Sequence, residues 1–299
     1  MPNTLVHLGI NGLVTRTLIK KSDLILIYIG SVIPDFPWII QRLVSWLNPN
    51  VNNYDLRLYS IVLASLLFSI ILSFGLANLF INSKRTFIIF SAGSLIHLLL
   101  DSFETKWGNG VHFFSPFTWE LVNFRFFWSE DIIIYCATGF GLLFMVLNWR
   151  ETLSTSITFS NKVQKNILVF IFCIIIYFFL PLLFMNSAES ADNHFVKTLR
   201  NEGYRIGKYF ETDRGFFINS PVQDKFRTPF DEELEVANLN LSSSEKMSIR
   251  AKFISKDEIQ IIEYHIHHNR DLFSYAGLFL LLILFITSMF KTGILKIRS

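Results

Sequence analysis

Charged residues are scarce in this chain of 299 residues. Asp, Glu, Lys and Arg make up 17% of the sequence, against about 25% in typical soluble domains. The net charge of +3 is small, and no segment concentrates Lys and Arg on one face as nucleic-acid-binding domains do. We therefore expect no nucleic-acid partner.

Cysteine is rare as well, and both residues, Cys136 and Cys173, lie in apolar runs. This placement predicts small buried side chains, and it carries no information about the redox compartment. A cleaved signal peptide is not expected, because the first apolar run keeps Asn, Thr and Arg and lacks a small-residue cleavage site. No pattern in the sequence sets an oligomeric state.

Hydrophobic residues dominate instead, at 51% of the chain with 32 Phe and a mean hydropathy of +0.41. This composition predicts an integral membrane protein. Apolar runs of the length of a membrane span predict five transmembrane helices. They cover residues 58–81, 86–103, 132–147, 167–185 and 272–290.

Two shorter apolar runs precede these helices. Residues 4–19 predict a helix of about 24 Å, just short of a full span. Residues 24–33 predict a second short helix that is stopped by Pro34-Asp35-Phe36-Pro37, so that the two form a hairpin. Residues 38–47 contain two Trp and one Arg, which is typical of the membrane interface.

The segment 186–271 differs in kind, because it holds most of the charges and alternates polar with apolar residues at 233–241, 247–254 and 258–266. Alternation with period two predicts β-strands. We therefore expect a mainly α fold, a polytopic membrane helical bundle, with a small extramembrane all-β domain inserted before the last span. A sandwich and an OB-like barrel are both open. The expected division is a core at 1–185, the β domain at 186–271, and a last span with a basic tail at 272–299.

Positive charge in short loops sets the expected orientation, because such loops tend to stay in the cytoplasm. The clusters are Lys84 and Arg85; Arg150, Lys162 and Lys165; and Lys291, Lys296 and Arg298. All three can be cytoplasmic at once, which places residues 104–131 and the β domain outside and the C-terminus inside. We expect a bacterial inner membrane.

The strongest functional signal is the pair His97 and Asp101 in the run 86–103. At a spacing of i and i+4 the two lie on the same helix face. They are able to ligate one divalent metal ion, or to form a hydrogen-bonded pair, and both interpretations stay open here. An Asp near the middle of a membrane helix costs about 2.5 kcal/mol or more, so such groups normally face a cavity, a metal or each other.

The predicted orientation has a consequence for five polar residues. His7, Asp35, Tyr59, His97 and Asp101 all fall at the outer ends of their helices. Four separate segments would then bring polar side chains to one depth in the membrane, which strengthens the prediction of a shared site.

Several short motifs occur in a characteristic order: a His in the first helix (His7), Gly-Ser-x-x-Pro-Asp at 30–35, His-Leu-Leu-Leu-Asp at 97–101, and Gly-x-x-Phe-Phe-x-Pro-Phe at 110–117. Over about residues 1–148 the chain resembles the YdjM-like family of predicted membrane-bound metal-dependent hydrolases, also described as LexA-binding and inner-membrane-associated. The resemblance implies a helical membrane core with a metal site and hydrolytic chemistry. It implies His7, Asp35, His97 and Asp101 as metal ligands.

The chain departs from this family at one motif. Where members carry His-Arg-x-x-Thr-His-Ser, residues 54–60 read Tyr-Asp-Leu-Arg-Leu-Tyr-Ser, so Tyr54 and Tyr59 replace two histidines and Ser60 is kept. A neutral phenol with a pKa near 10 is a weak ligand. The four remaining ligands, two imidazoles and two carboxylates, suit Zn²⁺ or Mn²⁺.

Further residues are expected to contact these ligands without binding the metal themselves: Tyr59, Ser60, Glu104 and His112. In a hydrolase, Asp35 or Asp101 would be the general base, whichever is left free of the metal. The expected substrate is a membrane lipid or a lipid-linked ester or phosphodiester, because the site lies at the outer interface.

Two other functions compete with this one. The loss of two histidines favours a non-catalytic membrane scaffold or binding protein that keeps a degenerate metal site and displays the β domain. A transporter is a weaker alternative, because the intramembrane charges gather at one end and not at the midplane.

The remaining candidate residues favour structural roles. His265 and His267 share one strand face, next to His268, which suits chelation; a polar, aromatic end of the β domain is the favoured interpretation. His194 is expected to be an ordinary surface residue. Arg125 is expected to contact lipid phosphate.

Arg125 and the glycines of the span 132–147 each have a second interpretation. Arg125 would otherwise pair with Glu130 or Asp131. The glycines Gly139 and Gly141 lie within an apolar span, which predicts close helix packing and not a phosphate-binding loop.

Overall fold

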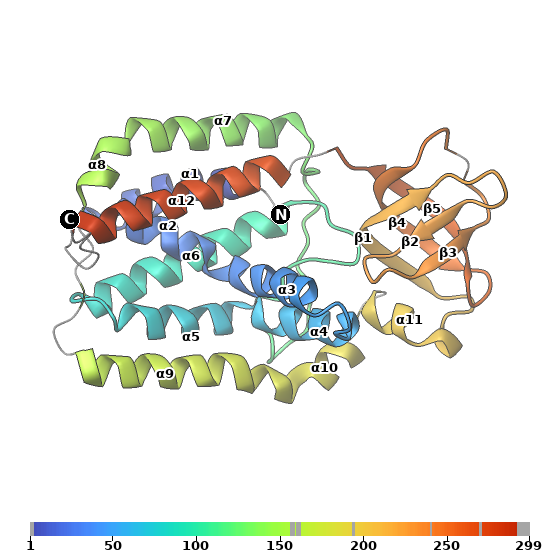
Figure 1. Ribbon diagram of the computed structural model, residues 1–299, viewed down its shortest axis with the longest axis horizontal. Helices are drawn as coiled ribbons and strands as arrows, with labels where there is room; N and C mark the ends of the chain where they lie inside the picture. The colour runs from blue at the N-terminus through green and yellow to red at the C-terminus, as the bar shows by residue number, and fades with distance from the viewer. Residues whose placement is uncertain are drawn as a thin grey trace.

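The computed structural model describes residues 3–155, 159, 163–192, 195–239, 241–268 and 271–291. The helices form an elongated bundle, and a small β-barrel lies at one end of it (Figure 1). The barrel is inserted before the last helix. The prediction of a mainly helical chain with a small β domain at this position is confirmed.

The N-terminal part begins with α1 (Thr4–Leu18), which the side chain of Asn3 caps by accepting from the Val6 backbone N–H. A second helical stretch follows as α2 (Leu24–Val32), the 3₁₀ turn η1 (Ile33–Asp35) and α3 (Phe36–Leu47). The predicted α-helix at 24–33 ends as expected, at Val32, but Pro34 and Pro37 do not end the helical path. Each stands at the start of a new helical segment, where no intrahelical N–H donor is needed, so the chain continues helically over Leu24–Leu47.

The run at 58–81, predicted as one transmembrane helix, is broken into two helices. These are α4 (Asn53–Leu63) and α5 (Leu66–Ala77), which meet at an angle of 71°. The chain leaves the helical conformation at Ser65, whose φ of −88° and ψ of 165° are extended. The following helix, α6 (Ser83–Phe103), is straight enough to count as one span and agrees with the prediction.

The second half of the bundle is formed by helices on both sides of the barrel segment. They are α7 (Ile132–Leu147), α8 (Trp149–Ser154), α9 (Val163–Phe179), the 3₁₀ turn η2 (Leu180–Phe184), α10 (Met185–Ser190) and α12 (Asp271–Lys291). The helix α7 has the predicted bounds, but its 16 residues are fewer than a full membrane span needs.

Four helical stretches in the described part of the chain are long and apolar enough to cross a membrane. They are Leu24–Leu47, Ser83–Phe103, Lys165–Ser190 and Leu272–Phe290, and the bent pair α4–α5 would be a fifth.

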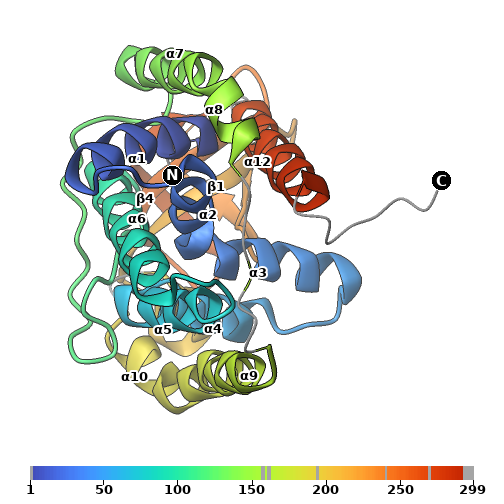
Figure 2. The ribbon, with the colours of Figure 1, turned by 90° about the vertical axis from the view of Figure 1, so that its left-hand side faces the viewer.

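Viewed along the bundle, α2 lies near the centre, with α7 and α9 on opposite sides (Figure 2). Close approaches between helices depend on glycine. A Cβ on Gly141 of α7 would lie 2.3 Å from the Leu5 carbonyl oxygen of α1, so the predicted packing role of Gly141 is confirmed. Gly139 has no atom within 4 Å of such a Cβ, and its predicted packing role is wrong.

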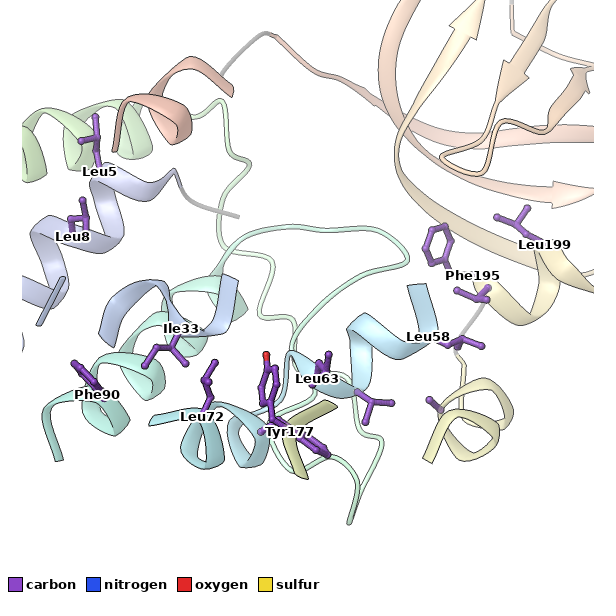
Figure 3. Packing of buried hydrophobic residues seen from close by; sticks show 14 of the residues in the cluster. Leu5, Leu8, Ile33, Leu58, Leu63, Leu72, Phe90, Tyr177, Phe195 and Leu199 are labelled. Atoms are coloured by element: carbon purple, nitrogen blue, oxygen red, sulfur yellow. The ribbon is translucent and has the colours of Figure 1, made fainter. Parts of the chain in front are cut away.

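The apolar core is continuous from the bundle to the barrel (Figure 3). Leu5 and Leu8 of α1, Phe90 of α6 and Leu72 of α5 belong to the bundle part of it. At the other end, Leu58 of α4 and Phe195 line one small pocket at the joint with the barrel.

The β domain is a closed barrel in the strand order β1-β2-β3-β5-β4. Its strands are β1 (Tyr209–Ile218), β2 (Lys225–Arg227), β3 (Glu233–Val236), β4 (Glu245–Phe253) and β5 (Glu258–Ile266). All pairs are antiparallel except β3 with β5. Of the two predicted forms, the barrel is therefore confirmed and the sandwich is wrong; five strands is also the number in OB-folds.

Two side-chain clusters join the barrel to the helices. The buried Arg205 donates to both carboxylate oxygens of Glu232 at 2.6 and 2.8 Å, and the hydroxyl of Tyr54 in α4 donates to the same carboxylate at 3.3 Å. On the other side, the loop 104–131 packs on the barrel, where Trp107 lies under the guanidinium of Arg250 at 4.9 Å. Between these clusters the chain forms α11 (Val196–Arg200) and η3 (Glu202–Tyr204).

The end of the bundle remote from the barrel is basic. Arg85 donates to the carbonyl oxygens of Lys20 and Lys21 at 2.8 and 2.6 Å, and Arg16 pairs with Glu151 at 2.5 Å. This end also holds α8 and the end of α12 (Figure 1). The predicted basic residues Lys162, Lys296 and Arg298 lie outside the described residues.

Candidate metal centre

Three of the four predicted ligands meet inside the bundle. The rings of His7 on α1 and His97 on α6 are stacked, with centroids 3.7 Å apart and planes 11° apart. The Oδ1 atom of Asp101 lies 3.4 Å from Nε2 of His7, and Oδ2 lies 3.7 Å from Nε2 of His97. One ligand atom from each residue falls within 4.8 Å of the others.

The crossing of α2 and α6 fixes the orientation of His97. A Cβ on Gly93 would lie 2.9 Å from the carbonyl carbon of Gly30, so these helices touch through backbone. The contact brings the carbonyl oxygen of Ser31 to 2.5 Å from Nδ1 of His97, where it accepts that N–H. The proton is thereby held on Nδ1, and the lone pair of Nε2 points toward the carboxylates. Metal-binding histidines are commonly oriented in this way.

The three residues fit a metal ion better than they fit a hydrogen-bonded cluster. Their exposed fractions are 1% for His7, 0% for His97 and 5% for Asp101. Yet Nε2 of both histidines and Oδ1 of Asp101 have no hydrogen-bond partner. Buried polar atoms are normally paired. Tetrahedral bonds of about 2.0–2.1 Å would place two ligand atoms roughly 3.3 Å apart, close to the observed 3.4 Å between His7 and Asp101.

Asp35, the fourth predicted ligand, lies beside this group and not within it. It is the last residue of η1, and its Oδ1 is 3.5 Å from Nε2 of His97. Its side chain is 14% exposed, against 7% for Asp101. Asp35 is therefore the carboxylate that is better placed to contact a bound substrate or water.

A lysine that the sequence did not single out completes the site. Nζ of Lys106 lies 3.5 Å from Asp101 and 3.8 Å from Glu104, and the side chain is 5% exposed. Burial disfavours its charge, but these two carboxylates more than offset that effect and raise the pKa of Lys106. Lys106 is therefore a buried cation next to the predicted ligands.

The site opens into a cavity of about 430 Å³ between the bundle and the barrel. Asp35, Asp101 and Lys106 form part of its wall, and Asp213 and Arg214 face it from a bulge in β1. The bulge occurs where Arg214 adopts a positive φ of 60°. Sites for small molecules commonly occupy 300–1,000 Å³, so this cavity is large enough for a lipid head group.

Of the residues predicted to support the ligands, only Glu104 is at the site, through Lys106. The hydroxyl of Tyr59 donates to the Phe178 carbonyl at 2.7 Å, and Ser60 donates to the Leu56 carbonyl of its own helix. His112 packs against Trp119 and lines a different pocket. The structure thus directs these three side chains away from the ligands.

A second group with metal-ligand spacing lies at the barrel. Glu130, just before α7, accepts from Nδ1 of His267 at 2.9 Å, and its other oxygen lies 3.4 Å from Nε2 of His265. The indole of Trp128 stacks on His265 with centroids 3.8 Å apart. Nε2 of His267 also contacts the Ser248 hydroxyl at 2.7 Å. These partners hold the pKa of the Glu130 carboxyl well below its usual range, against the effect of its burial.

This second group has hydrogen-bonding partners that the first group lacks, and it links the end of β5 to the start of α7. It agrees with the favoured interpretation of a polar, aromatic end of the β domain. His268 is exposed, and His194 lies outside the described residues. Arg125 lies 3.9 Å from Glu211 of the barrel, and not next to Glu130 or Asp131.

Lys106 and Glu130 were missed by sequence reasoning for different reasons. Lys106 follows Asp101 by five residues, after the helix has ended, so no helical spacing connects them. For Glu130 the sequence offered only a weak signal, the acidic pair Glu130-Asp131 directly before an apolar run. Neither a family model, nor a curated protein, nor a solved structure matches the chain.

Proposed function

We propose that this protein is a membrane-embedded metal-dependent hydrolase, in line with the family that its N-terminal half resembles. The observation that carries the proposal is the group of His7, His97 and Asp101, whose ligand atoms gather within 4.8 Å while the histidine Nε2 atoms have no hydrogen-bond partner. Two histidines and one carboxylate form a common catalytic ligand set for Zn²⁺, and Mn²⁺ is the other candidate. The tyrosines at 54 and 59 point elsewhere, which favours one metal ion.

A divalent ion held here would supply Lewis-acid polarisation and an activated water at neutral pH. Asp35 and Lys106 have different roles in this proposal. Asp35 lies at the cavity wall and outside the three-residue group, so it is the general base. Lys106 holds Asp101 in its charged form and adds positive charge to the cavity.

The substrate in this proposal is a membrane lipid or a lipid-linked ester or phosphodiester. The cavity wall includes Ile39 of α3 and Leu278 of α12, and both helices belong to stretches able to cross a membrane. On α3, Leu43 and Trp46 are exposed. A lipid could therefore place its head group in the cavity and its chains along these helices.

The proposal includes a location in a bacterial inner membrane. The basic end of the bundle would lie in the cytoplasm. The barrel and the candidate metal centre, at the other end, would then lie at the outer surface. This supports a substrate in the outer leaflet.

The direct test is turnover in lipid vesicles. The purified chain is reconstituted with Zn²⁺ or Mn²⁺ into vesicles of mixed phospholipids, and water-soluble and lipid products are followed by mass spectrometry. We expect products with the wild type, and none after chelation or with Asp35→Asn. No hydrolysis of any phosphodiester or acyl ester by metal-loaded protein would contradict the proposal.

One observation favours the alternative of a non-catalytic scaffold. The hydroxyl of Tyr54, at a position where the family carries a ligand histidine, donates to Glu232 of the barrel. At this position, where the family has a ligand histidine, the side chain instead forms a contact with the β domain. A scaffold would bind metal without turnover and would tolerate Asp35→Asn, so the vesicle assay separates the two functions.

A further inference from the structure

Arg57 of α4 is held between two aromatic rings. Its guanidinium carbon lies 4.6 Å from the ring of Trp38 on α3 and 5.6 Å from the ring of Phe195. Contacts of this kind fix the plane of a guanidinium and leave its N–H groups free to donate at the edge. The two rings therefore hold the side chain directly, while Asp213 and Asp192 act on its charge only from beyond ion-pair distance.

No ion pair or hydrogen bond to Arg57 occurs among the residues that the structure describes, and its buried Nε has no partner. The other partly buried arginines near the barrel are paired: Arg205 with Glu232, Arg200 with Asp55 and Arg250 with Glu211. Removing a cation from water without a counter-charge is costly. An anion that binds to Arg57 would remove this cost.

Arg57 belongs to the wall of the same cavity as Asp35, Asp101 and Lys106. Most of the other charges there are matched, since Lys106 pairs with Asp101 and Arg214 lies 3.8 Å from Asp213. Two described cations of the wall have no ion pair, Arg42, which is exposed, and Arg57, which is half-buried. The wall as a whole is balanced in charge, but on the side formed by α4 it offers a ligand a guanidinium that no described carboxylate contacts within ion-pair distance.

We propose that Arg57 binds a phosphate group of the substrate, and so selects phosphoesters among the lipid substrates left open above. The proposal rests on the proposed function, because it assigns the substrate class of that site. The chemistry favours phosphate: a planar guanidinium donates two parallel hydrogen bonds to its oxygens, whereas a neutral acyl ester gives no reason for an unpaired arginine. Within the hydrolase, Arg57 orients the phosphate and Asp35 faces it from the end of η1.

The test is equilibrium binding to the full chain in an uncharged detergent. Isothermal titration is performed with inorganic phosphate and, separately, with a soluble short-chain phosphatidylglycerol. The wild type is compared with Arg57→Gln, with Arg57→Lys, and with the control Arg227→Gln, which removes an exposed arginine from β2. The series is repeated in the His97→Ala background, so that a metal ion does not supply the affinity.

We expect Arg57→Gln to weaken binding by about ten- to a hundredfold in both backgrounds, as for the loss of hydrogen bonds to a charged group. Arg57→Lys should retain part of the affinity, and Arg227→Gln all of it. A loss confined to phosphatidylglycerol identifies a lipid phosphodiester as the ligand, and a loss confined to inorganic phosphate identifies a free phosphate. Unchanged binding of both ligands to Arg57→Gln, or no binding to the wild type, overturns the proposal.

Metal content measured on the same samples keeps this proposal separate from the proposed function. If the wild type holds no metal but Arg57→Gln loses phosphate binding, the phosphate site stands and the hydrolase fails. If the wild type binds metal and phosphate binding does not depend on Arg57, the metal centre stands and the phosphate site fails. Where the wild type binds metal, equal metal content in Arg57→Gln also shows that the variant is folded; where it binds none, an unchanged thermal unfolding transition shows it.

Discussion

His97 contacts different partners with its two ring nitrogens. Nδ1 donates to the Ser31 carbonyl, while Nε2 lies near Asp35 and Asp101 without a hydrogen bond to either. One nitrogen is thus used for orientation and the other is left for a ligand. Because the orienting group is backbone, the arrangement depends on the helix crossing and not on one further side chain.

The first prediction concerns Asp35. Asp35→Asn removes the proposed base but leaves His7, His97 and Asp101 in place, so metal content should stay at the wild-type level. Turnover should fall about a hundredfold or more, as for the loss of a general base. Metal analysis and the vesicle assay on the same preparation provide the check. Wild-type turnover would show that Asp35 is not the base.

The second prediction concerns Lys106. In metal-stripped protein, Lys106→Met leaves Asp101 buried without its cation, and stability should fall by about 3–5 kcal/mol. The control Lys225→Met breaks an exposed pair with Glu233, which is worth about 1 kcal/mol at most. Thermal unfolding in detergent compares the two, and adding Zn²⁺ should rescue part of the loss. Equal effects of both substitutions would argue against a buried charge network.

At this scale the sequence predicted three of the four side chains that gather at the site, His7, His97 and Asp101, but not the residues around them. The spacing of His97 and Asp101 follows from one helix, so it can be predicted from local geometry. Lys106 and Arg57 reach the site through a loop and a neighbouring helix, and no local pattern carries that information. Tyr59 points away from the site, because its hydroxyl donates to the Phe178 carbonyl of α9.

Among the elements, the contact between α2 and α6 determines the geometry of the site. Gly93 gives the third prediction. In Gly93→Ala the new Cβ would lie 2.9 Å from the Gly30 carbonyl carbon, so the helices must separate. We expect a loss of about 1–3 kcal/mol in stability and metal affinity about tenfold weaker, because the Ser31 carbonyl moves away from His97.

Gly139→Ala is the matched control, because nothing lies within 4 Å of its new Cβ. This variant should be as stable as the wild type or more so, since alanine favours the helix. Metal titration and thermal unfolding of both variants test the idea. If Gly93→Ala binds metal as the wild type does, the crossing does not control the site.

Helix boundaries were predicted with mixed success, for physical reasons. Prolines 34 and 37 were taken as stops, but both occupy first-turn positions, where proline is tolerated. No proline or glycine at the bend after Leu63 indicates in the sequence that the helix ends there. In the barrel, β5 was predicted with its observed bounds, whereas β1 was missed because the bulge at Arg214 interrupts the alternation.

For the whole molecule, the arrangement of charge along the long axis gives the fourth prediction. Variants with one new cysteine, Ser243→Cys in the barrel or Lys84→Cys at the basic end, are made in a background lacking Cys136 and Cys173. Both positions are exposed. In intact spheroplasts a membrane-impermeant maleimide should label only the barrel cysteine, and lysis should expose the other. Labelling of Lys84→Cys before lysis would reverse the proposed orientation.

The overall architecture was predictable because it follows from composition: long apolar runs predict helices, and alternation predicts strands. The cavity was not, since it forms between α3, α4, α12 and the barrel, which are far apart in the sequence. The β domain therefore has a role that its sequence does not reveal. It closes one side of the cavity that holds Asp35 and Asp101.

The central claim, that His7, His97 and Asp101 hold a metal ion, is tested most directly by the metal content of the purified chain, measured by mass spectrometry. After loading with Zn²⁺ or Mn²⁺ and gel filtration, we expect about one ion per wild-type chain and per Tyr59→Phe chain, and a near-complete loss in His97→Ala and Asp101→Ala. The Tyr59 variant controls for the family position that points away from the site. No metal in the wild type after loading, or equal metal in all four proteins, would contradict the claim.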